Sequence, residues 1–276
     1  MIELEMNNFD EIRSLFSCSD HLRFTIDAVI AGNSPGRIWV DNHNKPTVAL
    51  LWDTYHCYYL GGTANNDQFN VDLKELLFDE IIPVVIEKNR EIYKVEYSYK
   101  EWEPILEKIL ETKFPVKVAR KFFILDTLLT RQWKEILPSN FKVRKIDKNL
   151  FESDIRYIER IRDEINECWY SVDDFLARGF GFCLIYSSKE MEEVQGWCTG
   201  EYFSEGKCGI GIETFQGYRR RGFATAMASA FVEHSLSINI QPYWDASADN
   251  HASVRVAEKV GFKQIQDYYV LFGTFK

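Results

Sequence analysis

The stretch that begins at Cys208 constrains the fold more than any other part of the chain. An apolar, strand-like run, CGIGIETF, is followed directly by QGYRRRGFATAMA, in which Arg219, Gly222 and Ala224 stand where a loop enters a helix. Backbone N–H groups at a helix N-terminus have no partner inside the helix and carry partial positive charge, so they form a site for an anion. Glycine at position 222 lets a phosphate approach the backbone. In a chain of net charge -9, the three consecutive arginines add a local cationic cluster, so the stretch predicts a cradle for a diphosphate-bearing ligand.

The residues after this loop predict a helix, a short strand and a second helix. The first helix begins at Phe223 and is rich in alanine and serine, which allow close packing on a sheet. The strand spans 243–247. Asp249 or Asn250 is a suitable N-cap for the second helix, and Gly261 is placed to end it in the left-handed conformation.

This order of elements resembles the acetyl-CoA-binding half of GNAT-superfamily N-acetyltransferases. The shared features are a strand, an Arg-x-x-Gly-x-Ala loop, a helix, a strand, an Asn-x-x-Ser helix and a Gly-Phe stop. The runs GIGIETFQGYRRRGFATAMASAFVEH and PYWDASADNHASVRVAEKVGF are similar to a two-domain bacterial GNAT acetyltransferase branch of that superfamily. The resemblance is strong over residues 142–276 and weaker before them. It implies an α/β fold with a mixed sheet, the GNAT fold in the C-terminal half.

The resemblance also implies an activity. An acetyl group would move from acetyl-CoA, as co-substrate, to an amine of a small molecule by direct transfer in a ternary complex. The positions that match the family's coenzyme-binding motif are Thr214, Phe215, Arg219, Arg220, Arg221, Gly222, Phe223, Ala224, Thr225, Asn250 and Ser253.

A length of 276 residues predicts two domains, and the hydrophobic pattern repeats one order of elements in both halves. The predicted elements of the first half are helices 19–31, 70–87 and 101–111 and strands 37–40, 46–52, 55–61, 93–98 and 116–125. Those of the second half are strands 142–146, 181–187, 194–202, 207–214, 243–247 and 262–272 and helices 150–168, 171–178, 222–237 and 250–260. We therefore expect a first domain over 1–125, a connector over 126–140 and a catalytic domain over 141–276.

The matching loop of the first half, GGTANN at 61–66, has glycines but no arginine. We expect a degenerate GNAT-like domain there, which does not hold coenzyme A and walls one side of the substrate cleft. The alternative is an unrelated α+β domain whose order of elements matches by coincidence.

The chemistry calls for a base, because an amine with a pKa near ~10 is mostly protonated at pH 7. Glu213 is the leading candidate, since it lies on the strand whose backbone should contact the thioester arm. Alternation along that strand could instead turn Glu213 to a solvated face. Glu201 on the preceding strand and Asp245 on the following one are the alternatives. The oxyanion donor is expected to be a backbone N–H near Thr214.

The residue at the family's general-acid position differs from the family pattern. Many relatives have a tyrosine four residues before the Gly-Phe stop, and this chain has Ala257 there. Tyr243, Tyr268, Tyr269 or a water would then protonate the leaving thiolate. Two further aromatic residues of the second half either line the acceptor pocket or belong to the core: Trp197 and Tyr202.

Composition excludes several other classes. An excess of 42 acidic over 33 basic residues argues against nonspecific nucleic-acid binding. No apolar run approaches the ~18 residues of a membrane span, and the N-terminus lacks the pattern of a secretory signal. The six cysteines lack Cys-x-x-Cys spacing and the histidines are scattered, so reduced buried thiols and no metal are expected. We expect a cytoplasmic protein with a small amine as substrate and no nucleic acid or membrane partner. Homodimer formation stays open.

Two functions from different classes remain after this reasoning. One is the N-acetyltransferase, and the other is a non-catalytic GNAT-like protein that binds an acyl-CoA as a sensor or scaffold. Ala257 and the unsettled base suggest the second. A Rossmann-type nucleotide binder is disfavoured, because no Gly-x-Gly-x-x-Gly follows a strand.

Overall fold

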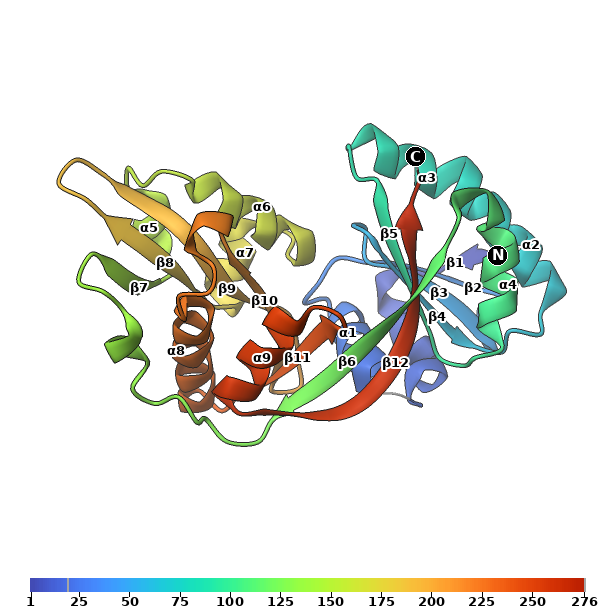
Figure 1. Ribbon diagram of the computed structural model, residues 1–276. Coiled ribbons are helices and arrows are strands. Elements are labelled where there is room, and N and C mark those ends of the chain that lie inside the picture. Colours follow the sequence, from blue (N-terminus) through green and yellow to red (C-terminus); the bar gives the residue numbers. More distant parts are fainter. Residues whose placement is uncertain (19, 276) are drawn as a thin grey trace. The chain divides into compact units, whose positions relative to one another are not determined.

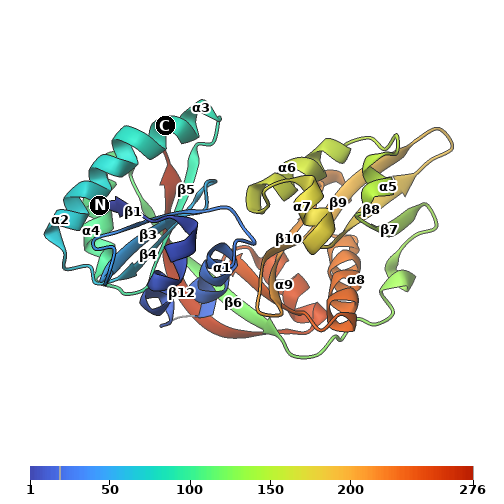
Figure 2. The same cartoon turned by 180° about the vertical axis from the view of Figure 1, so that it is seen from behind.

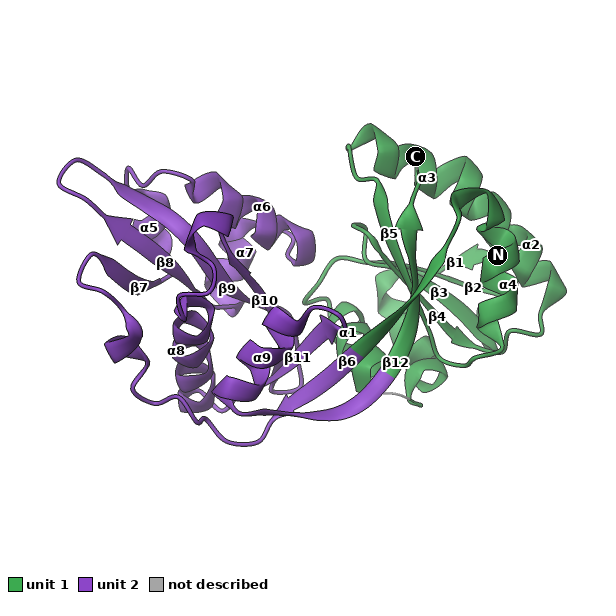
Figure 3. Cartoon of the chain, viewed as in Figure 1, with its two compact units in different colours: residues 1–120, 268–276 green, residues 121–267 purple. Residues whose placement is uncertain are grey.

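A computed structural model describes residues 1–18 and 20–275. The chain packs into two compact units, residues 1–120 with 268–276 and residues 121–267 (Figure 3). The sequence-based division placed all of 141–276 in one domain, whereas the end of the last strand packs in unit 1. This end belongs to unit 1 because its backbone pairs with a strand of that unit and because Leu271 and Phe275 are buried in the unit 1 core.

Unit 1 is a mixed sheet with helices on both faces. Its strands are β1 (Ile2–Glu3), β2 (Arg37–Val40), β3 (Val48–Trp52), β4 (Cys57–Gly62), β5 (Ile92–Tyr97) and the end of β12 (Phe262–Thr274). Neighbours are antiparallel except β4 and β5, which are parallel. Successive residues of β3 are all buried but enter opposite cores, because side chains alternate along a strand.

The helices of unit 1 cover these two faces. On one face lie α2 (Asp67–Glu75), the π-helical η2 (Leu76–Ile81), α3 (Ile82–Glu87) and α4 (Trp102–Ile109). On the other lie the 3-10 helix η1 (Met6–Phe16) and α1 (Asp20–Ile30) (Figure 2).

Unit 2 has the same plan. Its sheet contains β7 (Phe141–Lys145), β8 (Gly181–Ser187), β9 (Glu192–Ser204), β10 (Lys207–Thr214) and β11 (Gln241–Ser247). The pairs are antiparallel except β10 and β11, which are parallel. The helices are α5 (Lys148–Phe151), α6 (Ile158–Cys168), α7 (Val172–Arg178), α8 (Phe223–Ser237) and α9 (His251–Val260). Helices α6 and α8 lie on opposite faces of this sheet (Figure 1).

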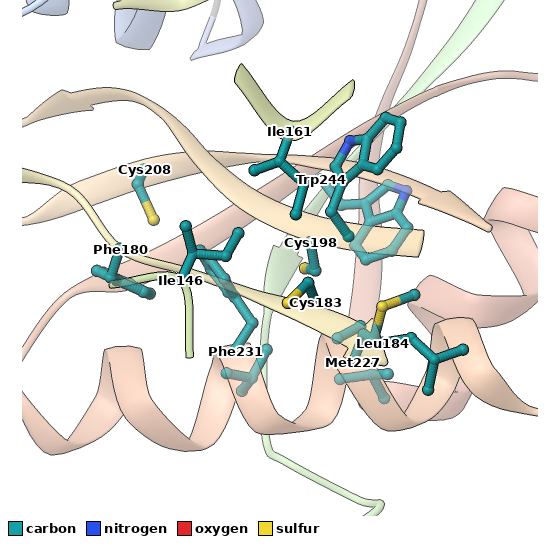
Figure 4. Close-up of a cluster of buried hydrophobic side chains, with 14 of the residues drawn as sticks. Ile146, Ile161, Phe180, Cys183, Leu184, Cys198, Cys208, Met227, Phe231 and Trp244 are labelled. Carbon is teal, nitrogen blue, oxygen red and sulfur yellow. The ribbon is translucent and has the colours of Figure 1, made fainter. Parts of the chain in front are cut away.

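The core of unit 2 fills the space between the sheet and these helices. Ile161 of α6 points into it from one side, and Met227 and Phe231 of α8 point into it from the other (Figure 4). All six cysteines are free, and five are buried while Cys18 is exposed.

The last strand of each half leaves its own unit. Strand β6 (Val116–Leu125) follows α4, and its residues from 121 onward belong to unit 2. Strand β12 follows α9, and its Leu271–Thr274 pair with Ile92–Val95 of β5 in unit 1. Each unit is therefore completed by chain that follows the other unit's last helix.

Most predicted elements are present, with differences at three places. The predicted helix 150–168 is divided into α5 and α6, and the predicted helix 70–87 contains the π-helical segment η2. The elements before residue 17, β1 and η1, were not predicted. The predicted start of a helix at residue 19 lies outside the described residues. Short 3-10 helices also occur at η3 (Glu111–Lys113), η4 (Trp133–Ile136) and η5 (Gln216–Tyr218). Across the described chain, every helix is too short or too polar to cross a bilayer.

Candidate functional site

A cavity of about 730 Å³ opens in unit 2 where strands β10 and β11 part. Their parallel pairing covers only Lys207–Cys208 and Gln241–Pro242, although both strands continue well beyond these residues. Backbone groups of β10 past this point are therefore not used in a ladder with β11. They can serve a ligand instead. The cavity is lined by Ile212, Glu213, Thr214, Tyr218, Arg219, Arg220, Gly222, Phe223, Ala224, Thr225, Trp244, Asn250, Ala252, Ser253, Arg255, Val256 and Lys259.

The loop before α8 leaves the N-terminus of that helix open. Gly222 is the N-cap with φ +82°, and no side chain caps the helix. A Cβ at position 222 would stand 2.8 Å from Cγ2 of Ile136, so glycine is required both by conformation and by space. The Nε–H of Arg219 donates to the Thr214 carbonyl at 2.9 Å, which fastens the loop to β10. The first-turn N–H groups of α8 are thus available to an anion.

Four cations surround this cavity without a counter-ion. Arg219 and Arg220 come from the loop, and Arg255 and Lys259 come from α9. Among the described residues none of the four forms an ion pair. In an acidic chain, four uncompensated cations around one cavity favour an anionic ligand.

Nine of the eleven predicted coenzyme residues line this cavity, and two do not. Phe215 lines a neighbouring cavity instead. Arg221 stacks against the rings of Phe141, Tyr218 and Phe223 and is not among the lining residues. Asn250 also caps α9, since its side chain accepts from the Ser253 N–H.

Sequence reasoning missed the lining residues of α9. These residues lie on one face of the helix, because Arg255, Val256 and Lys259 follow Ala252 by three, four and seven positions. Starting from the Asn250 cap, that periodicity would have found them. Tyr218 was also missed. It lines both cavities, and burial raises its pKa.

The second cavity, of about 540 Å³, shares Glu213, Tyr218 and Arg219 with the first. Its other lining residues are Tyr157, Arg160, Glu193, Gln195, Phe215 and Gln216. Glu213 thus lies where a ligand in one cavity would meet a ligand in the other.

The register of β9 and β10 decides which way Glu213 points. Trp197 pairs with Glu213, and Glu201 pairs with Gly209, so these residues share one face of the sheet. The opposite face belongs to α8, because a Cβ at Gly196 would stand 3.0 Å from Met227. Glu213 therefore faces the α6 side, half-buried, rather than a bare solvated face.

The other two predicted carboxylates lie on the same face but outside the cavities. A Cβ at Gly209 would stand 3.1 Å from the hydroxyl of Tyr243 on β11, and alternation places Asp245 on the same side as Tyr243. Glu201 and Asp245 line neither cavity. Of the three candidates, Glu213 is the one next to ligand-sized space.

A fourth carboxylate, that of Glu164 on α6, could not be identified as a site residue from the sequence. Its Oε1 lies 2.7 Å from the point where a Cβ of Gly211 would stand, and the Glu201 carboxylate lies closer still. The pKa of Glu164 is raised to about 7, mainly by burial; the charges of Glu167 and Glu213 also raise it, and a hydrogen bond from Trp197 lowers it. A carboxyl with a pKa near neutrality inside an acidic group of side chains is a functional-site candidate.

Replacing Glu164 with glutamine is expected to stabilise the fold most at neutral and higher pH. A carboxyl whose folded-state pKa is raised stabilises the folded state fully below its unfolded pKa of about 4.3, and that contribution is lost as pH rises through about 7. Melting curves between pH 5 and 8 should show the variant's advantage growing up to about pH 7 and then levelling. The exposed Glu159 on the same helix provides the control, Glu159→Gln, with a constant difference. A constant difference for Glu164→Gln as well would contradict the raised pKa.

The tyrosines considered as general acid are distributed over both units. Ala257 is buried in the unit 2 core. Tyr268 and Tyr269 belong to unit 1, where the Tyr268 ring stacks on His21 and its hydroxyl accepts from Arg120. Tyr243 lies in unit 2 beside Gly209. Trp197 is buried, and Tyr202 is half-buried against the core.

The corresponding turn in unit 1 is closed. There β4 and β5 pair over Cys57–Leu60 and Lys94–Tyr97, so they do not part as β10 and β11 do. The N-terminus of α2 is capped by Asn66, whose side chain accepts from the Phe69 N–H. That unit 1 does not hold coenzyme A stays a prediction, and this geometry supports it.

Unit 1 contains one group of side chains with metal-ligating chemistry among the described residues. Asp53, His56 and Cys57 offer ligand atoms within 4.8 Å of one another. Asp53 already accepts from the backbone N–H groups of Tyr55 and Cys57, and the positive charge of Lys94 lies near all three side chains. A cation would meet this positive charge, so we assign no metal.

Comparisons with known proteins match the chain along most of its length. A family model described as GNAT acetyltransferase matches residues 15–271. The uncharacterized N-acetyltransferase YdfB of Bacillus subtilis (strain 168) is 22% identical over 273 residues, which are 98% of this chain and 97% of that protein.

Solved structures agree in fold. The crystal structure of a GCN5-related N-acetyltransferase-like protein from Streptococcus suis 89/1591 has a TM-score of 0.74 at 19% identity, covering 97% of this chain and 98% of its own. A tandem GNAT protein from the clavulanic acid biosynthesis pathway has a TM-score of 0.54 at 10% identity, covering 99% and 97%. At such identities the likeness shows a shared fold.

Proposed function

This chain belongs to the GNAT acetyltransferase family, and we propose that it transfers an acetyl group from acetyl-CoA to an amine of a small molecule by direct transfer in a ternary complex. The GNAT fold expected from the sequence is confirmed by the structural neighbours. The observation that carries the proposal is the 730 Å³ cavity with its open helix N-terminus and its four uncompensated cations.

The residues of this cavity fit coenzyme A. The first-turn N–H groups of α8, with Arg219 and Arg220, would hold the diphosphate, and Arg255 and Lys259 offer positive charge for a further phosphate. The hydroxyl of Thr214 is buried without a hydrogen-bond partner in the described chain, so a ligand would satisfy it. When bound, the coenzyme supplies the acetyl thioester.

The second cavity is our proposed acceptor site. An amine that reaches it as an ammonium ion must lose a proton, and Glu213, with Glu201 and Asp245 on the same face, provides the carboxylate for it. The free amine then attacks the carbonyl carbon, the C–N bond forms and the C–S bond breaks. Unpaired backbone N–H groups near Thr214 would donate to the oxyanion, and the leaving thiolate takes up a proton.

Replacing Arg255 with alanine is expected to weaken coenzyme A binding about tenfold, because a charge-assisted contact to phosphate is lost. The loss should shrink at high salt, since such contacts are screened. Calorimetric titration of the full chain with coenzyme A measures this. Arg221→Ala is the matched control, because Arg221 stacks on the ring of Phe141 and is not among the residues that line the cavity. Equal losses in both variants would contradict the assignment of α9 to the coenzyme site.

A non-catalytic acyl-CoA sensor or scaffold is the second candidate function, favoured by Ala257 at the family's tyrosine position. The two are separated by incubating the chain with acetyl-CoA and a panel of amines. Release of free thiol supports the enzyme, and tight binding without release supports the sensor. Thermal-shift screening of amines with coenzyme A present would find the acceptor, because bound ligand raises stability. We place the activity in the cytoplasm, consistent with six free thiols.

A further inference from the structure

We propose that the second cavity binds an acceptor that carries a carboxylate as well as its amine, and that Arg160 of α6 binds this carboxylate. The proposal rests on the proposed function and narrows it. It names the substrate class as amino acids with an apolar side chain, in place of simple amines or polyamines. Arg160 is then a residue that determines substrate specificity.

The first support is that Arg160 has no ionic partner. It lines the second cavity, and its guanidinium lies over the ring of Phe215, with 4.9 Å from Cζ to the ring centroid. Within the described chain this guanidinium forms neither an ion pair nor a hydrogen bond. Arg162 on the same helix also stacks on a phenylalanine, Phe151, but it is paired with Glu159 at 3.4 Å and lines neither cavity. Stacking leaves the N–H donors of Arg160 available to a carboxylate.

The second support is a buried amide in the wall of the cavity. Gln195 is 2% exposed, and its Nε2 donates to Oε2 of Glu193 at 3.0 Å. The other oxygen of Glu193 is paired with Arg156 at 3.1 Å. Because the carboxylate holds the nitrogen end of the amide, its oxygen end is the one left for a ligand. No hydrogen bond from the described residues reaches that oxygen, and an ammonium group of the acceptor would supply one.

The third support is the separation of charge in this cavity. Glu213 lines it and forms no ion pair within the described residues. Phe215 follows Glu213 by two positions, which is about 7 Å along an extended chain, and the positive charge of Arg160 lies over that ring. An amino acid offers an ammonium and a carboxylate to these two charges at once. A simple amine would leave Arg160 without a partner, and a polyamine would bring a second cation towards it, which is repulsive.

The apolar part of the wall indicates the kind of side chain. The rings of Tyr157, Phe215 and Tyr218 line the cavity. Tyr157 and Phe215 meet edge to face, with ring centroids 6.1 Å apart. Tyr157 also has φ +66° at the N-cap of α6, a strained conformation for a tyrosine, and such strain is typical of ligand sites. A cavity of about 540 Å³ with this wall suits an apolar or aromatic side chain.

The test compares amino acids with amines that differ from them by one carboxylate. The probes are L-phenylalanine and L-leucine, with 2-phenylethylamine and 3-methylbutylamine as their counterparts, and kcat/KM is measured from thiol release. The wild type should prefer the amino acids by at least about tenfold, the usual effect of a hydrogen bond to a charged group. Arg160→Ala should abolish this preference, mainly through KM, and Arg160→Lys should restore part of it. Taking the ratio between variants cancels the difference in amine pKa. Arg162→Ala is the matched control and should keep the wild-type preference.

A second measurement decides the proposal without turnover. Calorimetry on the full chain saturated with coenzyme A should show that Arg160→Ala weakens L-phenylalanine binding by at least about tenfold, with coenzyme A affinity unchanged. Weaker coenzyme A binding in Arg160→Ala would assign Arg160 to the coenzyme and overturn the proposal, as would failure of both amino acids to bind. Thiol release with no preference for a carboxylate would leave the acetyltransferase standing and overturn the substrate class. Arg160-dependent binding of L-phenylalanine without thiol release would support the amino-acid site and contradict the proposed transfer.

Discussion

Replacing Gly222 with valine is expected to reduce the affinity for coenzyme A by at least about 100-fold while the chain still folds. Gly222 has φ +82°, and its missing side chain keeps open the space before the first turn of α8. A valine there would strain the loop by about 1–3 kcal/mol and press against Ile136. It would also deny a phosphate its approach to the backbone.

A control variant must separate the effect of backbone strain from the effect of blocking the phosphate site. Gly206 also has positive φ, +73°, but a Cβ there would meet only the Asn239 carbonyl at 3.7 Å, outside the cavity. Gly206→Val therefore introduces a similar backbone strain without touching the cradle. Calorimetry should show normal coenzyme A affinity for Gly206→Val and no measurable binding for Gly222→Val, with similar losses of melting temperature. Normal affinity in both would show that the phosphate cradle lies elsewhere.

Replacing Glu213 with glutamine is expected to lower kcat by about 10²–10⁴-fold, the usual effect of losing a general base. Acetyl-CoA affinity should stay the same, because the coenzyme would be held by backbone groups and cations and not by this carboxylate. Raising the pH should partly restore the rate, since more amine is then already neutral. The acid limb of the rate profile should flatten, because the base that titrates there is removed. The lost charge should also lower the pKa of Glu164.

The comparison variants are Glu201→Gln and Asp245→Asn. Both carboxylates share the sheet face with Glu213 but line neither cavity, so we expect smaller losses. Initial rates at several pH values, with separate measurement of coenzyme affinity, distinguish the three. If Glu213→Gln keeps its rate at pH 7 and one of the others loses it, the role of base passes to that residue. If all three stay active, the reaction proceeds mainly by positioning.

The coenzyme cradle could be predicted from sequence because its signals are local. Gly222, the arginines before it and the Asn250 cap are fixed by spacing along one loop or one helix. The direction in which each arginine side chain points depends on residues that are distant in sequence. Arg221 stacks on Phe141, which lies about 80 positions earlier in a different strand.

The position of Glu164 near Glu213 could not be predicted from the sequence. Its neighbours along α6 read as an ordinary amphipathic helix, and its role depends on which residues of β9 and β10 face that helix. A shift of one residue in that register would turn Glu213 and Trp197 to the other face. The sequence could propose Glu213, but only the fold brings Glu164 to it.

Each unit is completed by a strand that follows the other unit's last helix, and this affects how the chain folds during synthesis. The sheet of unit 1 is completed by Leu271–Thr274, which are synthesised after the residues of unit 2, 121–267. Most of unit 1 therefore leaves the ribosome well before its closing strand exists, and strand β5 waits with an unpaired edge. Contacts so distant in sequence slow folding. We expect that a chain stopped shortly before β12 would accumulate as an aggregation-prone intermediate, even though every residue of the coenzyme cavity would already be present.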